Sequence, residues 1–198
     1  MGLDMYLTKF IKIEGLGAND YGRASNLVST KYTKLLKRDG VTYLNEAKPV
    51  EQIEYIDFEA EGFGVGSNAL NVSQSFYNGD RRFPVLGIEV GYWRKANAVH
   101  RWFVTHVQGG VDDCGYYVVQ KSDLNRLRIA TMKAMEAFNR GDLDACAKAL
   151  PAQEGFFFGS QDYGEWYLED LVLTLEIIDD TLLSVDWDRD VLIYRASW

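Results

Sequence analysis

The pattern that most constrains the fold lies near the C-terminus, where apolar residues recur with the period of an α-helix. Acidic side chains fall between these residues, so the helix would have one apolar face and one acidic face. Such a helix gains most of its stability by packing its apolar face against other elements. We therefore predict a long helix that begins near residues 160–162 and covers a hydrophobic core. The apolar residues that define it are Leu168, Leu171, Leu175, Ile178 and Leu182.

Two more helices are predicted upstream of this one. Residues 122–138 have a helical apolar stripe, and Ser122 is a suitable N-cap because its hydroxyl can accept a hydrogen bond from the first turn. Residues 142–150 form a shorter candidate helix. Asp142 can cap its start, and Pro151 ends it because proline cannot continue a helix.

Residues 90–108 also match the helical period. The Gly109-Gly110 pair that follows is typical of a helix C-terminus. The segment is therefore predicted to be helical, on the basis of the spacing of Tyr92, Ala96, Val99, Phe103 and Val107.

Strands are predicted at residues 3–13, 53–61, 116–119 and 188–198, where apolar residues tend to alternate with polar ones. The first predicted elements are strands, most predicted elements of the second half are helices, and the last predicted element is a strand. This order predicts an α+β fold, with an antiparallel or mixed sheet and three or four helices packed on one face. A length of 198 residues without a Pro-rich linker predicts a single domain over residues 1–198.

The composition narrows the functional classes. A net charge of -8 argues against direct nucleic-acid binding, which needs clustered Lys and Arg. No signal-like segment and no apolar run long enough for a membrane span are visible, so no membrane association is expected. Cys114 and Cys146 are far apart and indicate free thiols in a reducing compartment. These features predict a cytoplasmic protein.

Common cofactor and metal motifs are incomplete. The glycines of residues 62–66 follow a predicted strand, but Ser67 stands where a dinucleotide fingerprint needs its third glycine. His100 and His106 are six residues apart, which does not give the one-turn spacing of a helical zinc pair. We therefore expect neither a cofactor nor a metal.

The segment 91–103 contains two tryptophans, three cations, an asparagine and a histidine, in a chain of which 14% is aromatic. On a helix, Trp93, Asn97 and His100 would share one face. An indole could stack on a flat ligand, while cations and polar groups could bind its charge. The alternative is a half-buried helix whose tryptophans fill the core. The predicted ligand-binding residues are Trp93, Arg94, Lys95, Asn97 and His100, with the loop 156–163 nearby.

Two other activities remain open. His100 could act as a general base oriented by Asp112 or Asp113, as in a small hydrolase or transferase. The acidic face of the last helix could instead occupy the basic surface of a host nucleic-acid-binding protein and so inhibit it. The solvated face of an ordinary amphipathic helix would look the same in the sequence.

Four motifs resemble those of a family of small phage and bacterial proteins with no established activity. They are MGLDMYL at residues 1–7, EVGYWRKAN at 89–97, DDCG at 112–115 and GFFFGS at 155–160. The resemblance implies a phage-associated accessory protein and assigns no role to any residue. Aromatic and cationic density without a complete catalytic motif predicts a non-catalytic binder. Its partner would be a small anionic or aromatic ligand, or a host protein.

Overall fold

The computed structural model describes residues 2–25, 55–57, 69–71, 76–77, 84–85 and 87–198. The chain forms two compact units. One comprises Met1–Thr8, Glu89–Asp188 and Leu192–Trp198, and the other comprises Lys9–Ile88 and Arg189–Val191. The assignment of residues 1–198 to a single domain stays a prediction.

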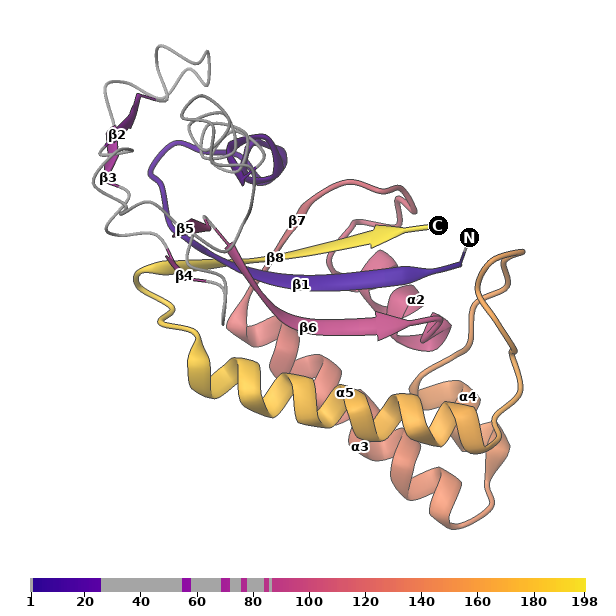
Figure 1. Cartoon of the computed structure of the whole chain (residues 1–198). Helices are drawn as coiled ribbons and strands as arrows, with labels where there is room; N and C mark the ends of the chain where they lie inside the picture. Colours follow the sequence, from indigo (N-terminus) through magenta and orange to yellow (C-terminus); the bar gives the residue numbers. More distant parts are fainter. Residues whose placement is uncertain (1, 26–54, 58–68, 72–75, 78–83, 86) are drawn as a thin grey trace, which may run out of the picture. The chain divides into compact units, whose positions relative to one another are not determined.

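A four-stranded antiparallel sheet is the central element of the fold (Figure 1). Its strand order is β6 (Gly87–Arg94), β1 (Asp4–Ile11), β8 (Asp190–Ser197) and β7 (Tyr117–Val119). The strands predicted at residues 3–13, 116–119 and 188–198 are confirmed.

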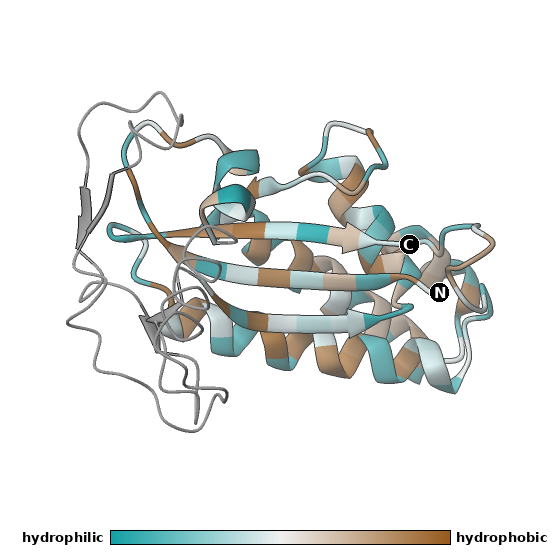
Figure 2. Cartoon of the chain, turned by 45° about the horizontal axis from the view of Figure 1, so that its top comes forward, coloured by the Kyte–Doolittle hydropathy of each residue, from teal (hydrophilic) through white to brown (hydrophobic). Residues whose placement is uncertain are grey.

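The two faces of the sheet differ because side chains alternate along each strand. In β1, Met5 and Leu7 are fully buried in the core, whereas Tyr6 lies on the opposite face beside Tyr92. Hydrophobic and hydrophilic residues alternate along the long strands in Figure 2. Gly91 of β6 allows close packing, because a Cβ there would lie 2.4 Å from Cγ2 of Ile177.

Helices cover the buried face of the sheet, which confirms the α+β class. Phe103 stacks on Tyr194 of β8 with ring centroids 3.9 Å apart, and the indole of Trp93 donates a hydrogen bond of 3.0 Å to Thr174. Two other helices pack together, and the longer one also contacts the last helix. The helices are α2 (Asn97–His106), α3 (Lys121–Asn139), α4 (Leu143–Ala149) and α5 (Glu165–Ser184).

The helix predicted over residues 90–108 is wrong in its first part. Residues 87–94 form strand β6, and only Asn97–His106 are helical. Lys95, with a φ of 62°, turns the chain between the two elements. The N-cap of α3 is also corrected from Ser122 to Gln120, which forms a capping box with Asp123. The Asp142 cap of α4 is confirmed, since its carboxylate accepts a hydrogen bond from Ala145 N.

The second unit has its own small set of contacts. Residues 18–25 are helical, a feature that the sequence analysis missed. Tyr21 packs against Phe10, and its hydroxyl accepts a hydrogen bond of 3.0 Å from Ile13 N. Two short antiparallel pairs complete the described part: β2 (Tyr55–Asp57) with β3 (Ala69–Asn71), and β4 (Phe76–Tyr77) with β5 (Pro84–Val85).

The strand predicted at residues 53–61 is confirmed at Tyr55–Asp57. Its other residues, and the glycine run of residues 62–66, lie outside the described residues.

Valine substitution at two buried threonines of α5 should change the free energy of unfolding differently. Thr174→Val removes the acceptor of the Trp93 indole and should lower the free energy of unfolding by about 1–3 kcal/mol. The Thr181 hydroxyl is buried and has no hydrogen-bond partner among the residues that the structure describes, so Thr181→Val should be neutral or stabilising. Urea denaturation measures both effects. Equal destabilisation by the two substitutions would contradict the assigned hydrogen bond.

Candidate functional site

The structure divides the five predicted ligand-binding residues into two groups. Trp93 and His100 are fully buried in the core. Arg94, Lys95 and Asn97 instead line a cavity of about 790 Å³. The proposed common helical face of Trp93, Asn97 and His100 does not form, because Trp93 belongs to a strand.

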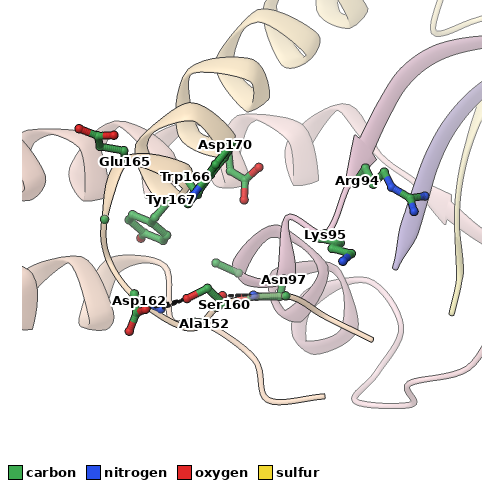
Figure 3. Close-up of a pocket in the computed structure, with 13 residues that line it drawn as sticks. Arg94, Lys95, Asn97, Ala152, Ser160, Asp162, Glu165, Trp166, Tyr167 and Asp170 are labelled. Carbon is green, nitrogen blue, oxygen red and sulfur yellow. Dashed lines mark hydrogen bonds between the residues drawn. The ribbon is translucent and has the colours of Figure 1, made fainter. Parts of the chain in front are cut away.

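Three segments form most of the wall of this cavity, and Ala152 also lines it (Figure 3). The turn from β6 into α2 supplies Arg94 and Lys95, and the loop 159–164 supplies Ser160 and Asp162. The first turns of α5 supply the remaining wall: Glu165, Trp166, Tyr167 and Asp170. The cavity therefore has two cations on one wall and carboxyl groups and aromatic rings on the others.

The turn at Lys95 has an unusual backbone conformation. Its φ of 62° lies in the left-handed region, which residues with a Cβ rarely adopt. The turn is held at both ends, because Lys95 N donates to Leu3 O at 2.8 Å and Asn97 N donates to Lys95 O at 2.8 Å. Backbone strain of this kind is often concentrated at functional sites. A glycine would adopt this φ with less strain than Lys95 does.

Asn97 attaches the loop of residues 153–160 to the start of α2. Its side-chain amide nitrogen donates to Phe158 O at 3.1 Å and to Ser160 O at 2.7 Å. Its side-chain oxygen accepts a hydrogen bond of 3.1 Å from Gln153 N. Asn97 is 5% exposed, so these bonds are shielded from water. Asn97 therefore builds one wall of the cavity, and both N–H donors of its amide are already used.

Arg94 is held at the edge of the cavity by a carboxylate. Its guanidinium donates to Asp4 Oδ1 at 2.6 Å, and the Tyr92 hydroxyl donates to the same oxygen. These hydrogen bonds, together with the positive charge of Arg94, hold the pKa of Asp4 below its usual value. The side chain of Arg94 stays 55% exposed. It can therefore still bind an anionic group through its remaining N–H donors.

Asp170 is the unusual ionisable group of the cavity. Burial, with a further contribution from the negative charge of Glu169, raises the pKa of its carboxyl group to about 7. Within the described part of the chain, no hydrogen-bond donor or cation is paired with this carboxyl group. Its side chain lies across the cavity from Lys95 in Figure 3. A half-buried carboxyl group without a partner is available for a ligand.

Two aromatic residues of α5, Trp166 and Tyr167, also line the cavity. Tyr167 is buried, and its hydroxyl donates to Leu150 O at 2.8 Å, which fixes α5 against the end of α4. Trp166 is 76% exposed at the opening. An exposed indole that lines a cavity with cations on another wall suits a flat anionic ligand, because its face can stack on a ring.

His100 lies in a separate buried network with Asp112 and Tyr194. Its Nε2 is 2.9 Å from Asp112 Oδ1, and its Nδ1 is 2.7 Å from the Tyr194 hydroxyl. Burial lowers the pKa of His100, which favours the neutral ring. In that form Nε2–H donates to Asp112, and Nδ1 accepts from Tyr194. Both ring nitrogens are occupied, so the arrangement favours a structural role over general-base catalysis.

Asp112 and Asp113 differ in what they contact. Asp112 also accepts hydrogen bonds from Gln153 at 2.8 Å and from the Trp198 indole at 3.3 Å. Asp113 instead closes its own turn, where it accepts hydrogen bonds from Gly115 N and the Tyr117 hydroxyl. Only Asp112 is therefore near His100. The catalytic hypothesis for these residues stays a prediction.

The acidic face of α5 is exposed at Glu165, Glu169 and Glu176. The hypothesis that this face inhibits a host protein stays a prediction. Two residues of the cavity, Asp170 and Trp166, were missed by the sequence analysis. Asp170 falls on the acidic side of the amphipathic pattern, and Trp166 lies outside the tryptophan-rich segment.

Comparisons with known proteins give no assignment: no family model, curated protein or solved structure matches this chain. Among the described residues, no group of three or more metal-binding side chains is present. Across the same residues, no helix is both long enough and apolar enough to cross a membrane.

Replacing Asp170 with asparagine should change how stability depends on pH. Between its ordinary pKa of 3.8 and about 7, the folded protein retains a proton that the unfolded chain has released. Wild-type stability therefore falls as pH rises through this window. Asp170→Asn removes this loss and should gain about 1–3 kcal/mol relative to wild type between pH 4 and pH 8, after allowing for solvent screening.

Urea denaturation at a series of pH values measures this gain. Glu176→Gln is the matched control, because Glu176 is an exposed carboxylate of the same helix and does not contribute to the raised pKa of Asp170. It should give a much smaller pH-dependent change. Parallel pH profiles for wild type and Asp170→Asn would contradict the raised pKa.

Proposed function

We propose that this protein is a non-catalytic binder of a small ligand that carries an anionic group and a flat ring. The observation that supports this most strongly is the cavity beside α5. It combines cations, an exposed indole and a half-buried carboxyl group that has no partner among the described residues, all of them within one compact unit. Ligand pockets commonly have these features: a concave and partly apolar wall with a few converging polar groups.

Each group would have a distinct role in binding. Lys95 and Arg94 would bind the anionic group, and Trp166 would stack on the ring. Asp170 would form a hydrogen bond in the middle of the cavity. In its protonated form it donates to a ligand acceptor, and in its ionised form it accepts from a ligand N–H or O–H. Asn97 would act indirectly, by holding the wall in place.

We also propose the context in which this binding occurs. The motif resemblance supports an accessory protein of a phage or of its bacterial host. The free thiols of Cys114 and Cys146 support the host cytoplasm as its compartment.

A second candidate function is catalysis in the same cavity, and one observation favours it. A carboxyl group with a pKa of about 7 can both donate and accept a proton near neutral pH. Asp170 would then replace His100 as the general acid or base of a small hydrolase or transferase. Chemical change of a bound ligand by wild type, and its loss in Asp170→Asn, would separate catalysis from binding.

Thermal unfolding in the presence of candidate ligands tests the proposed binding. The panel is made of nucleotides, cyclic dinucleotides and sugar phosphates. A compound that binds only the folded protein raises the melting temperature with concentration. Trp166→Ala should weaken binding by about tenfold, because it removes the stacking surface. Leu183→Ala should leave binding unchanged, since Leu183 is 87% exposed at the far end of α5.

Two results would contradict the proposal. One is a panel in which no compound shifts the melting temperature. The other is a ligand whose binding is the same in wild type and Trp166→Ala.

Lys95→Gly should separate stability from binding. Glycine adopts a positive φ freely, so the substitution should stabilise the fold by about 1 kcal/mol. It also removes a cation from the cavity and should weaken the binding of any anionic ligand found in the panel. Lys95→Ala, which keeps the strain, should weaken binding without the gain in stability. Denaturation and ligand titration measure the two effects, and a destabilised Lys95→Gly variant would contradict the assigned strain.

A further inference from the structure

A second cavity, of about 840 Å³, lies between α2, α3 and α4. We call it the basic groove. Five of the 21 lysines and arginines of the chain line it: Arg101 of α2, Arg126 and Lys133 of α3, Arg140 at the C-cap of α3, and Lys148 of α4. Among the lining residues Glu136 is the one carboxylate. This concentration of positive charge stands out on a chain with a net charge of -8.

Most of these cations are free to meet a partner. Lys133, Arg140 and Lys148 are exposed, and none of them forms an ion pair with a described residue. Arg126 is paired with Asp123 of its own helix, and Arg101 donates to Ala152 O at 2.8 Å. Like charges gathered in one groove repel each other, so an incoming anionic partner would relieve this repulsion.

The floor of the basic groove is apolar and has a regular spacing. Along α3, Arg126 and Lys133 lie seven residues apart, and Arg140 follows seven residues later at the C-cap. The half-buried Ala130 lies between the first two, whereas Ala137 is 1% exposed and belongs to the core. A seven-residue repeat keeps one face of a helix turned toward a second helix that runs along it. Ile129 adds an apolar side chain that is 53% exposed, and Ala145 and Ala149 of α4 border the same space.

We propose that the basic groove is a docking site for an acidic amphipathic helix of a partner protein. The apolar residues of that helix would pack on Ile129 and the half-buried Ala130, Ala145 and Ala149, and its Asp and Glu side chains would pair with the cations on the rim. This is the helix-in-groove mode of recognition, in which apolar anchors recur every three or four residues. The positive charge of the groove favours an acidic partner. Its apolar floor favours a partner helix that also has an apolar face.

A nucleic-acid strand fits the groove less well. Sites for single strands combine cations with exposed aromatic rings on which bases stack. In the basic groove, Trp102 is 6% exposed and is covered by the ring of His106, with centroids 4.6 Å apart. The exposed imidazole of His106 is the one ring in the lining that a base could reach. The exposed apolar side chain, Ile129, is aliphatic and suits leucine-like side chains better than bases.

The experiment uses a fluorescent peptide of about 18 residues, equivalent to five helical turns. It carries leucines along one face and glutamates on both flanks, and a second peptide has lysine at every glutamate position. Fluorescence anisotropy measures the binding of each peptide to the whole protein. The acidic peptide should bind with an affinity that falls as salt rises, and the lysine peptide should not bind.

Charge reversal locates the site. Lys133→Glu and Lys148→Glu should each weaken acidic-peptide binding by about tenfold. Lys121→Glu is the matched control, because Lys121 is exposed on α3 but does not line the groove, and it should change binding little. Circular dichroism establishes that each variant is folded. Trp166→Ala should leave peptide binding intact, so this test is independent of the ligand proposed for the cavity beside α5.

Three outcomes would overturn the proposal. The first is no binding of the acidic peptide. The second is an equal loss of binding in Lys121→Glu and Lys133→Glu, which would indicate nonspecific attraction. The third is tighter binding of a single-stranded oligonucleotide than of the acidic peptide at the same groove, which would assign it to nucleic acid.

Discussion

The cavity beside α5 depends on one side-chain amide, that of Asn97. A loop that covers a cavity has backbone groups that need partners, and Asn97 supplies them to Gln153, Phe158 and Ser160 at once. These bonds fix the loop against the start of α2. The left-handed turn at Lys95, directly before, directs the chain from the sheet into that helix. Without this junction, the cations of one wall and the carboxyl group of Asp170 would not face a common space.

The sequence predicts the helices of the second half well, because their apolar residues keep a 3.6-residue period over several turns. It fails at residues 90–96, where Tyr92 and Ala96 happen to fit the period of the following helix. The change of structure occurs at Lys95, a residue type that gives no signal of a left-handed turn. A glycine there would have marked the boundary. The strand residue Trp93 was consequently assigned to a helix face.

Three of the five residues predicted to bind a ligand line the cavity, and the other two are buried in the core. Arg94, Lys95 and Asn97 lie at the end of an element, where side chains can reach a cavity. Trp93 and His100 were also predicted there, but they find buried partners in Thr174, Asp112 and Tyr194, which are distant in sequence. Asp170 was counted with the solvated face of α5. It lies next to Leu171 and within one turn of Tyr167 and Thr174, all buried, and so sits at the edge of the core.

The proposed binding depends on Asp170 being a desolvated carboxyl group in an open cavity, available for a ligand. The most direct measurement is a pH titration of its side-chain carboxyl carbon by ¹³C NMR, with Asp170→Asn used to assign the signal. The account predicts a titration midpoint near 7, well above that of an exposed aspartate. A midpoint near 4 would show that the carboxyl group is fully solvated and would contradict the account.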